Sequence, residues 1–169
     1  MGYELSYIVE SKENIQILWD TDNYQKTYNQ ISLFHTYEDM PFELSQYDFS
    51  VGTRAWNPML LLLNNIINST LTERLIKDES WRTESSHSPK MMRLNNGEVN
   101  ELWNEMRKIS IIEIEKEASK NSQIIKQDKN NYHNWKIDRI DYIEREYIEL
   151  FKAIFEAHFN KYELLLTIE

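Results

Sequence analysis

Four histidines are the first candidates for acid–base or metal chemistry in this chain: His35, His87, His133 and His158. No two of them have the i,i+4 spacing that would place two metal ligands on one helical face, and there is no His-Glu-x-x-His motif. Cysteine is absent, which excludes thiolate metal sites and cysteine nucleophiles. We therefore expect no metal and no cofactor. His158 falls on the apolar stripe of a helical pattern, which favours a hydrogen-bonded core histidine.

A group of carboxylates near the end of the chain is the second candidate. Its members are Asp138, Asp141, Glu144 and Glu149. General acid–base catalysis requires two carboxyl groups in one pocket, with pKa values that burial moves apart. These acids are instead interleaved with the bases Arg139, Arg145 and Lys152. Such alternation is typical of a solvent-facing helix surface with salt bridges, which is what we predict here.

Arg82 and His87 are the third candidate, because they are separated by four residues. This Arg-x4-His spacing resembles the motif of the HEPN ribonucleases, which are all-helical bundles in which a polar residue such as Asn usually follows the arginine. The resemblance implies a nuclease that uses both side chains. Here Thr83 follows the arginine and Pro89 predicts a loop, so a solvated loop is the favoured interpretation. We expect no catalytic residue, and keep a cryptic nuclease or hydrolase that uses Arg82, His87 and nearby acids as an alternative.

The first third of the chain combines acidity with many aromatic side chains. Residues 1–50 hold two bases and nine acids, a net charge of −7 out of −9 for the whole chain, and residues 1–56 hold eleven aromatic residues. Aromatic rings anchor interfaces, and carboxylates around them steer a basic partner. Aromatic rings on the alternating strand-like segments are expected in the core, whereas those in two loop-like stretches fit a place in the core and a partner-binding surface equally well. The predicted partner-binding residues are Trp19, Asp20, Asp22, Tyr24, Tyr37, Glu38, Asp39, Phe42 and Glu43.

The elements that must position these residues begin with short strands. Residues 3–9, 15–19 and 31–35 are rich in β-formers and end in polar turn material, and residues 47–51 form another short candidate. Residues 24–29 fit a strand or a short helix equally well. We expect an antiparallel sheet in the first third of the chain.

Helical periodicity dominates the remainder. Asn57-Pro58 predicts an N-cap followed by proline at the first helical position, and apolar residues then continue on one face to Leu75. Residues 83–97 are predicted to be the main loop. Asn95 and Glu98 have capping-box spacing and begin a second helix that could extend to Ala118.

The clearest helical pattern lies near the end of the sequence. Its apolar positions are spaced three and four residues apart and comprise Ile137, Ile140, Ile143, Tyr147, Phe151, Ile154, His158 and Tyr162. A polar stretch at residues 119–131 precedes it, and residues 164–168 could end the helix or form a strand. We therefore predict one α+β domain over residues 1–169, with an N-terminal antiparallel sheet of short strands followed by three main helices packed on it.

Composition narrows the class of protein further. The acidic balance argues against binding to nucleic-acid phosphates, and the longest apolar run, residues 59–63, is too short to span a membrane. No export signal is recognisable at Met1, so a cytoplasmic location is expected. Asn, Ile, Lys and Tyr make up 57 of 169 residues, and their AT-rich codons favour a bacterial or phage origin.

These observations predict a noncatalytic acidic binding protein that neutralises a basic protein, either a toxin or a nucleic-acid-binding protein. The class that fits is an immunity protein against a bacterial nuclease-type toxin, because nucleases are basic and acidic inhibitors compete for that charge. A phage inhibitor of a host defence protein would use the same physics. A scaffold subunit is a further alternative, and would self-associate, whereas the binder is expected to be a monomer or weak dimer.

Overall fold

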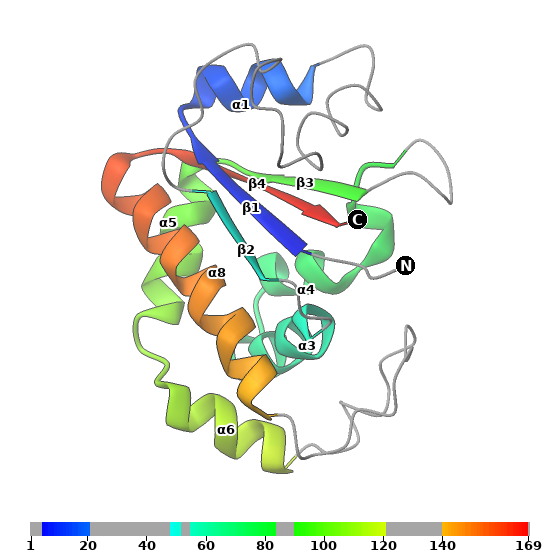
Figure 1. Cartoon of the computed structure of the whole chain (residues 1–169), viewed down its shortest axis with the longest axis vertical. Coiled ribbons are helices and arrows are strands. Elements are labelled where there is room, and N and C mark those ends of the chain that lie inside the picture. Colours follow the sequence, from blue (N-terminus) through cyan, green and yellow to red (C-terminus); the bar gives the residue numbers. More distant parts are fainter. Residues whose placement is uncertain (1–4, 21–47, 52–54, 84–89, 121–139, 169) are drawn as a thin grey trace.

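A four-stranded antiparallel sheet lies at the centre of the computed structural model, which describes residues 5–20, 48–51, 55–83, 90–120 and 140–168 (Figure 1). In spatial order its strands are β2 (Asp48–Val51), β1 (Leu5–Glu10), β4 (Glu163–Ile168) and β3 (Lys90–Leu94). With helices packed on this sheet, the predicted α+β class is confirmed. Two strands come from the acidic first third of the chain, and β3 and β4 complete the sheet.

Both faces of the sheet are covered, because every residue of β1 and β4 is buried. Alternate side chains of a strand point to opposite faces. On one face, Tyr7 and Leu166 join the large core formed with the helices that follow β2. On the other face, Ile8 and Leu165 pack with residues of α1 (Lys12–Trp19). The sheet therefore separates α1 from the larger helical layer (Figure 1).

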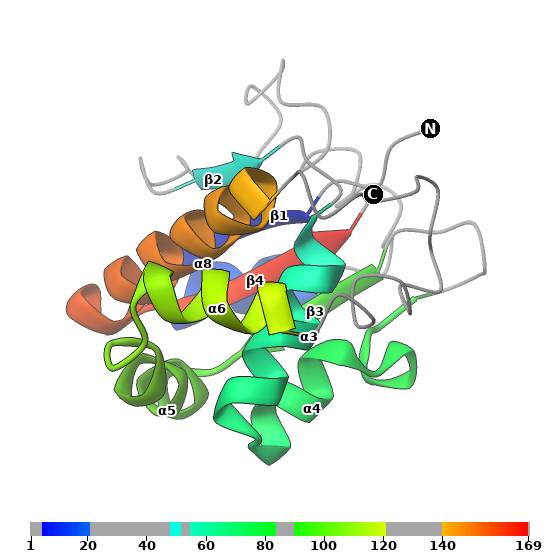
Figure 2. The ribbon, with the colours of Figure 1, turned by 90° about the horizontal axis from the view of Figure 1, so that it is seen from below.

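In the described part of the chain, the larger layer consists of five helices and a short 3-10 turn, η2 (Asp78–Ser80). The helices are α3 (Trp56–Ile67), α4 (Thr70–Ile76), α5 (Asn96–Met106), α6 (Ile111–Lys120) and α8 (Ile140–Asn160). Helix α8 packs on β1, β2 and β4, and α3, α5 and α6 pack against α8 (Figure 2). Helix α8 is therefore the main link between the sheet and the other helices, and α5 also packs directly on β3 and β4. Among the described residues, no helix has the length and apolar character needed to span a membrane.

Helix α1 is attached to the sheet by polar contacts as well as by apolar ones. Asn14 Nδ2 on α1 donates to Glu10 Oε2 on β1 at 3.1 Å, and Gln16 on α1 accepts a hydrogen bond from the guanidinium of Arg93, whose Nε also donates to Glu163 at 2.6 Å. Glu10 and Glu163 are partners across β1 and β4, and both are almost completely buried. Partners of this kind offset the cost of burying charge and fix the position of the helix.

The predicted strand at residues 15–19 is wrong, because this segment forms the second half of α1. Ser11 is the N-cap, and its hydroxyl accepts a hydrogen bond from the backbone N–H of Asn14 at 3.2 Å. Ile15 and Leu18, three residues apart, are buried on one side, while Ile17 is 45% exposed. A strand would have placed residues 15 and 17 on the same face, whereas the observed burial follows the period of a helix.

Three boundaries in the helical region also differ from the prediction. Helix α3 begins at Trp56 with Ala55 as its N-cap, so Pro58 stands third in the first turn, where its missing N–H is still harmless. The predicted continuation to Leu75 is broken at Asn68, whose left-handed backbone (φ 52°) separates α3 from α4. Helix α4 then begins at its own capping box, formed by Ser69 and Thr72.

The predicted main loop at residues 83–97 is wrong in part, because β3 occupies Lys90–Leu94. Met92 and Leu94 enter the large core while Met91 packs toward α1, which is the alternation of a strand covered on both faces. The residues at 164–168, which fitted a helix end or a strand, belong to β4. The predicted strands near residues 3–9 and 47–51 are confirmed as β1 and β2. Residues 24–29 and 31–35 lie outside the described part of the chain.

The capping box of Asn95 and Glu98 is confirmed at the start of α5. The N–H of Glu98 donates to Asn95 Oδ1 at 3.1 Å, and the N–H of Asn95 donates to Glu98 Oε2 at 2.9 Å. The helix ends at Met106 rather than at Ala118. A second reciprocal pair, Ser110 and Glu113, starts α6, and these hydrogen bonds lower the pKa of Glu113.

Candidate functional site

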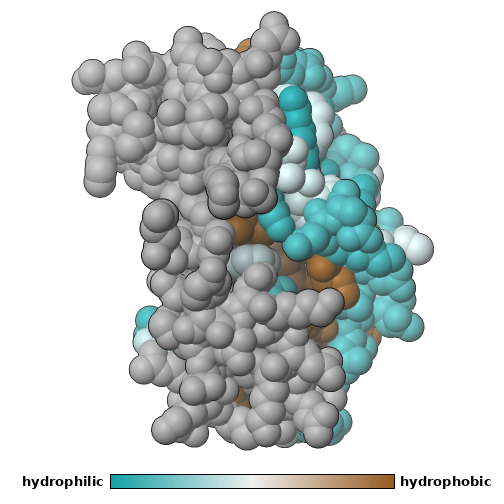
Figure 3. All heavy atoms as spheres, turned by 90° about the vertical axis from the view of Figure 1, so that its right-hand side faces the viewer, coloured by the Kyte–Doolittle hydropathy of each residue, from teal (hydrophilic) through white to brown (hydrophobic). Residues whose placement is uncertain are grey.

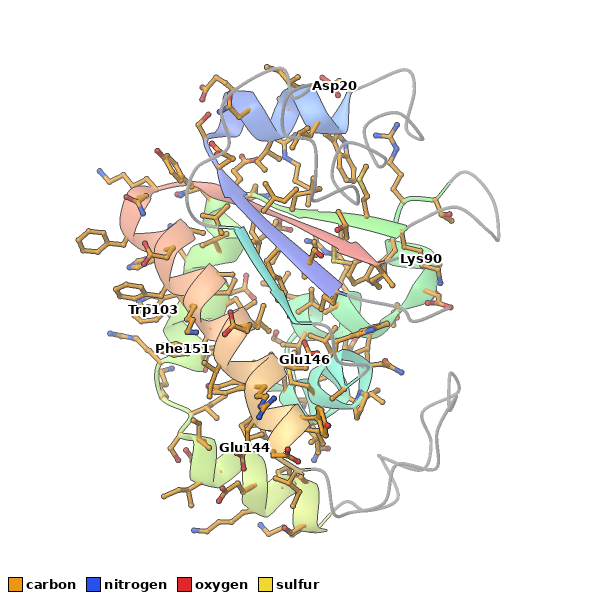
Figure 4. The ribbon with its side chains drawn as sticks, viewed as in Figure 1. Asp20, Lys90, Trp103, Glu144, Glu146 and Phe151 are labelled. Carbon is orange, nitrogen blue, oxygen red and sulfur yellow. The ribbon has the colours of Figure 1, made fainter. Side chains whose placement is uncertain are left out.

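Of the nine predicted partner-binding residues, the structure describes Trp19 and Asp20. Trp19 is half-buried and packs against the small apolar cluster between α1 and the sheet, and the guanidinium of Arg82 lies 5.2 Å from the centre of its ring. Asp20 is exposed at the end of α1 (Figure 4). The other seven lie outside the described residues: Asp22, Tyr24, Tyr37, Glu38, Asp39, Phe42 and Glu43.

Arg82 has a structural role in its surroundings. Its backbone pairs with Met91 through hydrogen bonds of 2.8 and 2.9 Å, and its guanidinium donates to the carbonyl oxygen of Trp19. The side chain thus links the end of α1 to β3. His87, its partner in the nuclease alternative, lies outside the described residues. In the described part of the chain, no group of three or more His, Asp or Glu side chains is placed to hold a metal ion.

The carboxylates near the end of the chain are distributed around α8. Asp141 is exposed, Glu149 accepts from Lys152 Nζ at 2.7 Å, and Asp138 lies outside the described residues. Glu144 lies beside α6, where partial burial and a hydrogen bond with the carboxyl group of Glu115 raise its pKa (Figure 4). The solvent-facing surface predicted from the charge pattern is therefore seen at Asp141, whereas Glu149 forms a salt bridge but its side chain is only 21% exposed.

Glu146 was not singled out by the sequence pattern, yet its side chain is completely buried on the inner side of α8 (Figure 4). It faces the sheet close to Tyr7, which is also completely buried. Burial, followed by the charges of Glu146 and Glu149, raises the pKa of Tyr7 well above its ordinary value, so the phenol stays protonated. The sequence does not distinguish Glu146 from the solvent-facing acids of α8, because the packing of the helix decides which of its acids point inward.

A row of aromatic side chains, which we call the ring ladder, lies where α5 packs on α8. It consists of Trp103 from α5 and of Tyr147, Phe151, Phe155 and Phe159 from α8. The centre of the Trp103 ring system lies 5.5 Å from that of Phe151 and 5.5 Å from that of Phe155. Phe155 and Phe159 stack at 5.9 Å. Both Trp103 and Phe151 lie at the same side of the molecule in Figure 4.

The ring ladder changes from buried to exposed along α8. Tyr147 is 3% exposed, Phe155 is 39% exposed and Phe159 is 73% exposed. At the buried end, the hydroxyl of Tyr147 donates toward the carbonyl oxygens of Met106, at 3.2 Å, and Ile109, at 3.1 Å. Burial raises the pKa of Tyr147 to about 12. The buried end fixes α5 to α8, and the other end presents aromatic surface to solvent.

His158 borders the ring ladder. Its Nδ1 lies 2.6 Å from Asn100 Oδ1, and its ring stacks on Trp103 with centres 5.3 Å apart. The predicted hydrogen bond is confirmed, although the side chain is half-buried rather than fully within the core. Asn100 and His158 together hold Trp103 in a fixed orientation.

The two helices that carry the ring ladder are acidic. Helices α5 and α8 hold eight acidic and two basic residues, a net charge of −6. The two bases are Arg145, which lies over the ring of Tyr142 at 5.8 Å, and Lys152, which pairs with Glu149. Arg107 and Lys108 follow α5 directly, and Lys108 pairs with Glu105. On the opposite side of the molecule, the described surface is mostly hydrophilic (Figure 3).

The sequence does contain a signal for the exposed end of the ring ladder. Phe155 and Phe159 are four residues apart, so they lie on one face of a helix. Each is one residue beyond the apolar stripe that includes Ile154 and His158, so this face is turned away from the core. Aromatic residues at such positions indicate exposed rings once the buried stripe has been assigned.

The sequence matches no family model and no curated protein sequence. The fold is similar to that of YfbM from Escherichia coli, a protein of unknown function whose crystal structure is known. The two chains share 11% sequence identity, the TM-score is 0.60, and the similarity covers 98% of this chain and 99% of that one. At this identity the similarity concerns the fold alone.

Proposed function

We propose that this chain is a noncatalytic acidic protein that binds and neutralises a basic protein, as an immunity protein does with a nuclease-type toxin. The observation that carries the proposal is the excess of acids over bases on α5 and α8, where seven acids besides the buried Glu146 stand against two bases. Both of those bases are already engaged within the chain, by Glu149 and by Tyr142. These helices therefore present a negative surface to a partner.

The chemistry of a nuclease makes such a surface effective. A nuclease is basic where it holds phosphate groups, so an acidic protein is attracted to that region and competes there with nucleic acid. Long-range attraction between opposite charges raises the association rate, and more so at low salt. The net charge of −7 in residues 1–50 adds to this field, and the nine residues predicted there remain candidates for a second contact region. The complex would form in the cytoplasm of the producing cell.

The proposal is tested with the product of the gene adjacent to the one that encodes this chain. That product is expressed alone and together with this chain, and growth of the host is measured. We expect the adjacent product to be basic and toxic, and co-expression to restore growth. A chain that restores no growth would contradict the proposed function.

The association rate of the purified pair provides the physical readout. Between about 50 mM and about 300 mM salt, the association rate should fall by at least tenfold if charge steers the encounter. An association rate that is indifferent to salt would contradict the role of the acidic surface.

A further inference from the structure

We propose that Trp103, Phe155 and Phe159 form a docking surface for an arginine-bearing face of the basic partner. This inference rests on the proposed function and names the surface and the chemistry that recognise the partner. It differs from the sequence prediction, which placed binding near Trp19 and in residues 22–43.

The rings form one continuous surface rather than isolated exposed residues. Phe159 is 73% exposed and stacks on Phe155, which in turn contacts Trp103 on the neighbouring helix. Single exposed apolar residues are ordinary, but contiguous exposed rings that span two elements mark interaction sites. Buried aromatic anchors contribute a large share of the binding energy in protein interfaces.

The surface is already ordered before a partner arrives. Trp103 is half-buried, is stacked under His158, and contacts Phe151 on its inner side. His158 is itself held by Asn100. Ordering the side chains is one of the main entropic costs of association, so a preformed surface retains more of the contact energy as affinity.

The charge around the rings selects the occupant. A second copy of this chain would bring a net charge of −6 on α5 and α8 against another −6, and an anionic lipid surface would meet the same repulsion. A basic protein meets attraction instead. Glu156 lies three residues before Phe159, so a carboxylate and an exposed ring are neighbours on the same helix face.

An exposed aromatic ring beside a carboxylate binds arginine better than lysine. A guanidinium group can stack on an aromatic face and pair with a carboxylate at the same time, whereas an ammonium group is a compact and strongly hydrated charge. The chain itself places a guanidinium over an aromatic ring twice, with Arg82 over Trp19 at 5.2 Å and Arg145 over Tyr142 at 5.8 Å.

The experiment measures binding of a fluorescent oligo-arginine peptide by anisotropy, beside an oligo-lysine peptide of equal length. The wild-type chain should bind the arginine peptide more tightly. The double variant Phe155→Ala/Phe159→Ala should lose about tenfold in affinity for the arginine peptide and should no longer distinguish the two peptides. Ile17→Ala is the matched control, because Ile17 is exposed on α1, across the sheet, and its removal should change neither affinity.

A second variant tests the carboxylate and keeps both rings. Glu156→Gln should weaken binding of the arginine peptide by about threefold. Sedimentation shows whether the rings serve self-association instead. A wild-type dimer that the double variant converts to a monomer would overturn the inference, and so would equal affinity of the double variant and the wild type for the arginine peptide, or no binding by the wild type.

Rescue of growth separates this inference from the function on which it rests. If the wild type rescues and the double variant rescues equally well, the docking surface is wrong and the proposed function stands. If the wild type fails to rescue, the proposed function fails whatever the peptides show. If the wild type rescues and the double variant does not, while its thermal unfolding matches that of Ile17→Ala, both proposals are supported.

Discussion

Trp19 and Phe159 are aromatic residues of two acidic regions, and they differ in what covers their rings. Trp19 lies at the end of α1, where it is half-buried against a cluster of apolar side chains and has Arg82 over its ring. Phe159 lies across the sheet near the end of α8, and most of its ring faces solvent. An aromatic residue in an acidic segment is therefore a strong interface candidate only where its own chain leaves the ring face accessible. By that criterion the end of α8 is a better site than the end of α1.

The largest expected effect lies within the ring ladder and separates its scaffold from its exposed end. Trp103→Ala should lower the free energy of unfolding by about 2–3 kcal/mol, because it removes the half-buried ring that contacts Phe151, Phe155 and His158. Phe159→Ala should change it by less than about 0.5 kcal/mol, since that ring is mostly exposed. Urea unfolding measures both values. Equal losses for the two variants would mean that Phe159 is part of the packed core.

Arg82 provides the corresponding test on the other side of the comparison. Arg82→Ala should lower the free energy of unfolding by about 1–2 kcal/mol, because the cation over Trp19 and the hydrogen bond to its carbonyl oxygen are lost together. Arg82→Lys, which keeps the charge without the planar guanidinium, should recover only part of that loss.

Hydrogen exchange of the backbone amides in α1 shows whether the loss of stability in Arg82→Ala is localised to this helix. Faster exchange in α1 is expected, because Arg82 links the end of this helix to β3. The control is Arg107→Ala, which removes an exposed arginine at the end of α5. If both variants lose the same stability, Arg82 does not hold Trp19, and the contrast between the two aromatic regions disappears.

A smaller effect is expected at the buried end of the ring ladder. Tyr147→Phe keeps the ring and removes the hydroxyl that donates toward the carbonyl oxygens of Met106 and Ile109. The loss should be about 1 kcal/mol in the free energy of unfolding. Urea unfolding measures this loss of stability. If the slope of the unfolding free energy against urea concentration is the same as in the wild type, the variant does not alter the unfolded state. No loss at all would mean that the hydroxyl does not fix the end of α5.

The elements that were predictable from the sequence are those with a local chemical signal. The capping box of Asn95 and Glu98 marked the start of α5, and the spacing of apolar residues marked α8. Residues 15–19 were wrongly predicted as a strand because Ile15, Ile17 and Trp19 alternate as in a strand, while the decisive N-cap, Ser11, lies before the segment. Strand β3 was not recognised because the residues of β4 that pair with it are 70 to 78 positions away, and pairing over that distance leaves little local signal in the sequence.

The candidate site was less predictable than the fold, for a physical reason. Whether an aromatic ring is available depends on what packs over it, as with Arg82 over Trp19, which lie 63 positions apart in the chain. The same is true of charge, because Glu146 is buried while Asp141 on the same helix is exposed. Sequence alone located the acidic and aromatic residues, but tertiary packing decided which of them face solvent.

The smallest expected effect is the pH dependence of stability that arises from the carboxyl pair of Glu144 on α8 and Glu115 on α6. Partial burial, together with the hydrogen bond and charge of Glu115, raises the pKa of Glu144 in the folded state above its ordinary value of 4.5. The folded state thus binds this proton more tightly than the unfolded state does. The resulting stability is complete below about pH 4.5 and is lost as the pH rises through the folded pKa. Glu144→Gln, which stays neutral, should therefore gain stability over the wild type above that pH and gain none below it.

Thermal unfolding from pH 4 to pH 7 measures the Glu144 effect, with Glu13→Gln as the matched control. Glu13 is exposed on α1, so this control removes the same formal charge from the other side of the sheet. The difference between the two variants reports the proximity of Glu144 to Glu115 rather than the lower net charge. Parallel stability profiles for the two variants would mean that the α6–α8 carboxyl pair has no effect of its own, and that its acids behave as a solvated surface like that of α1.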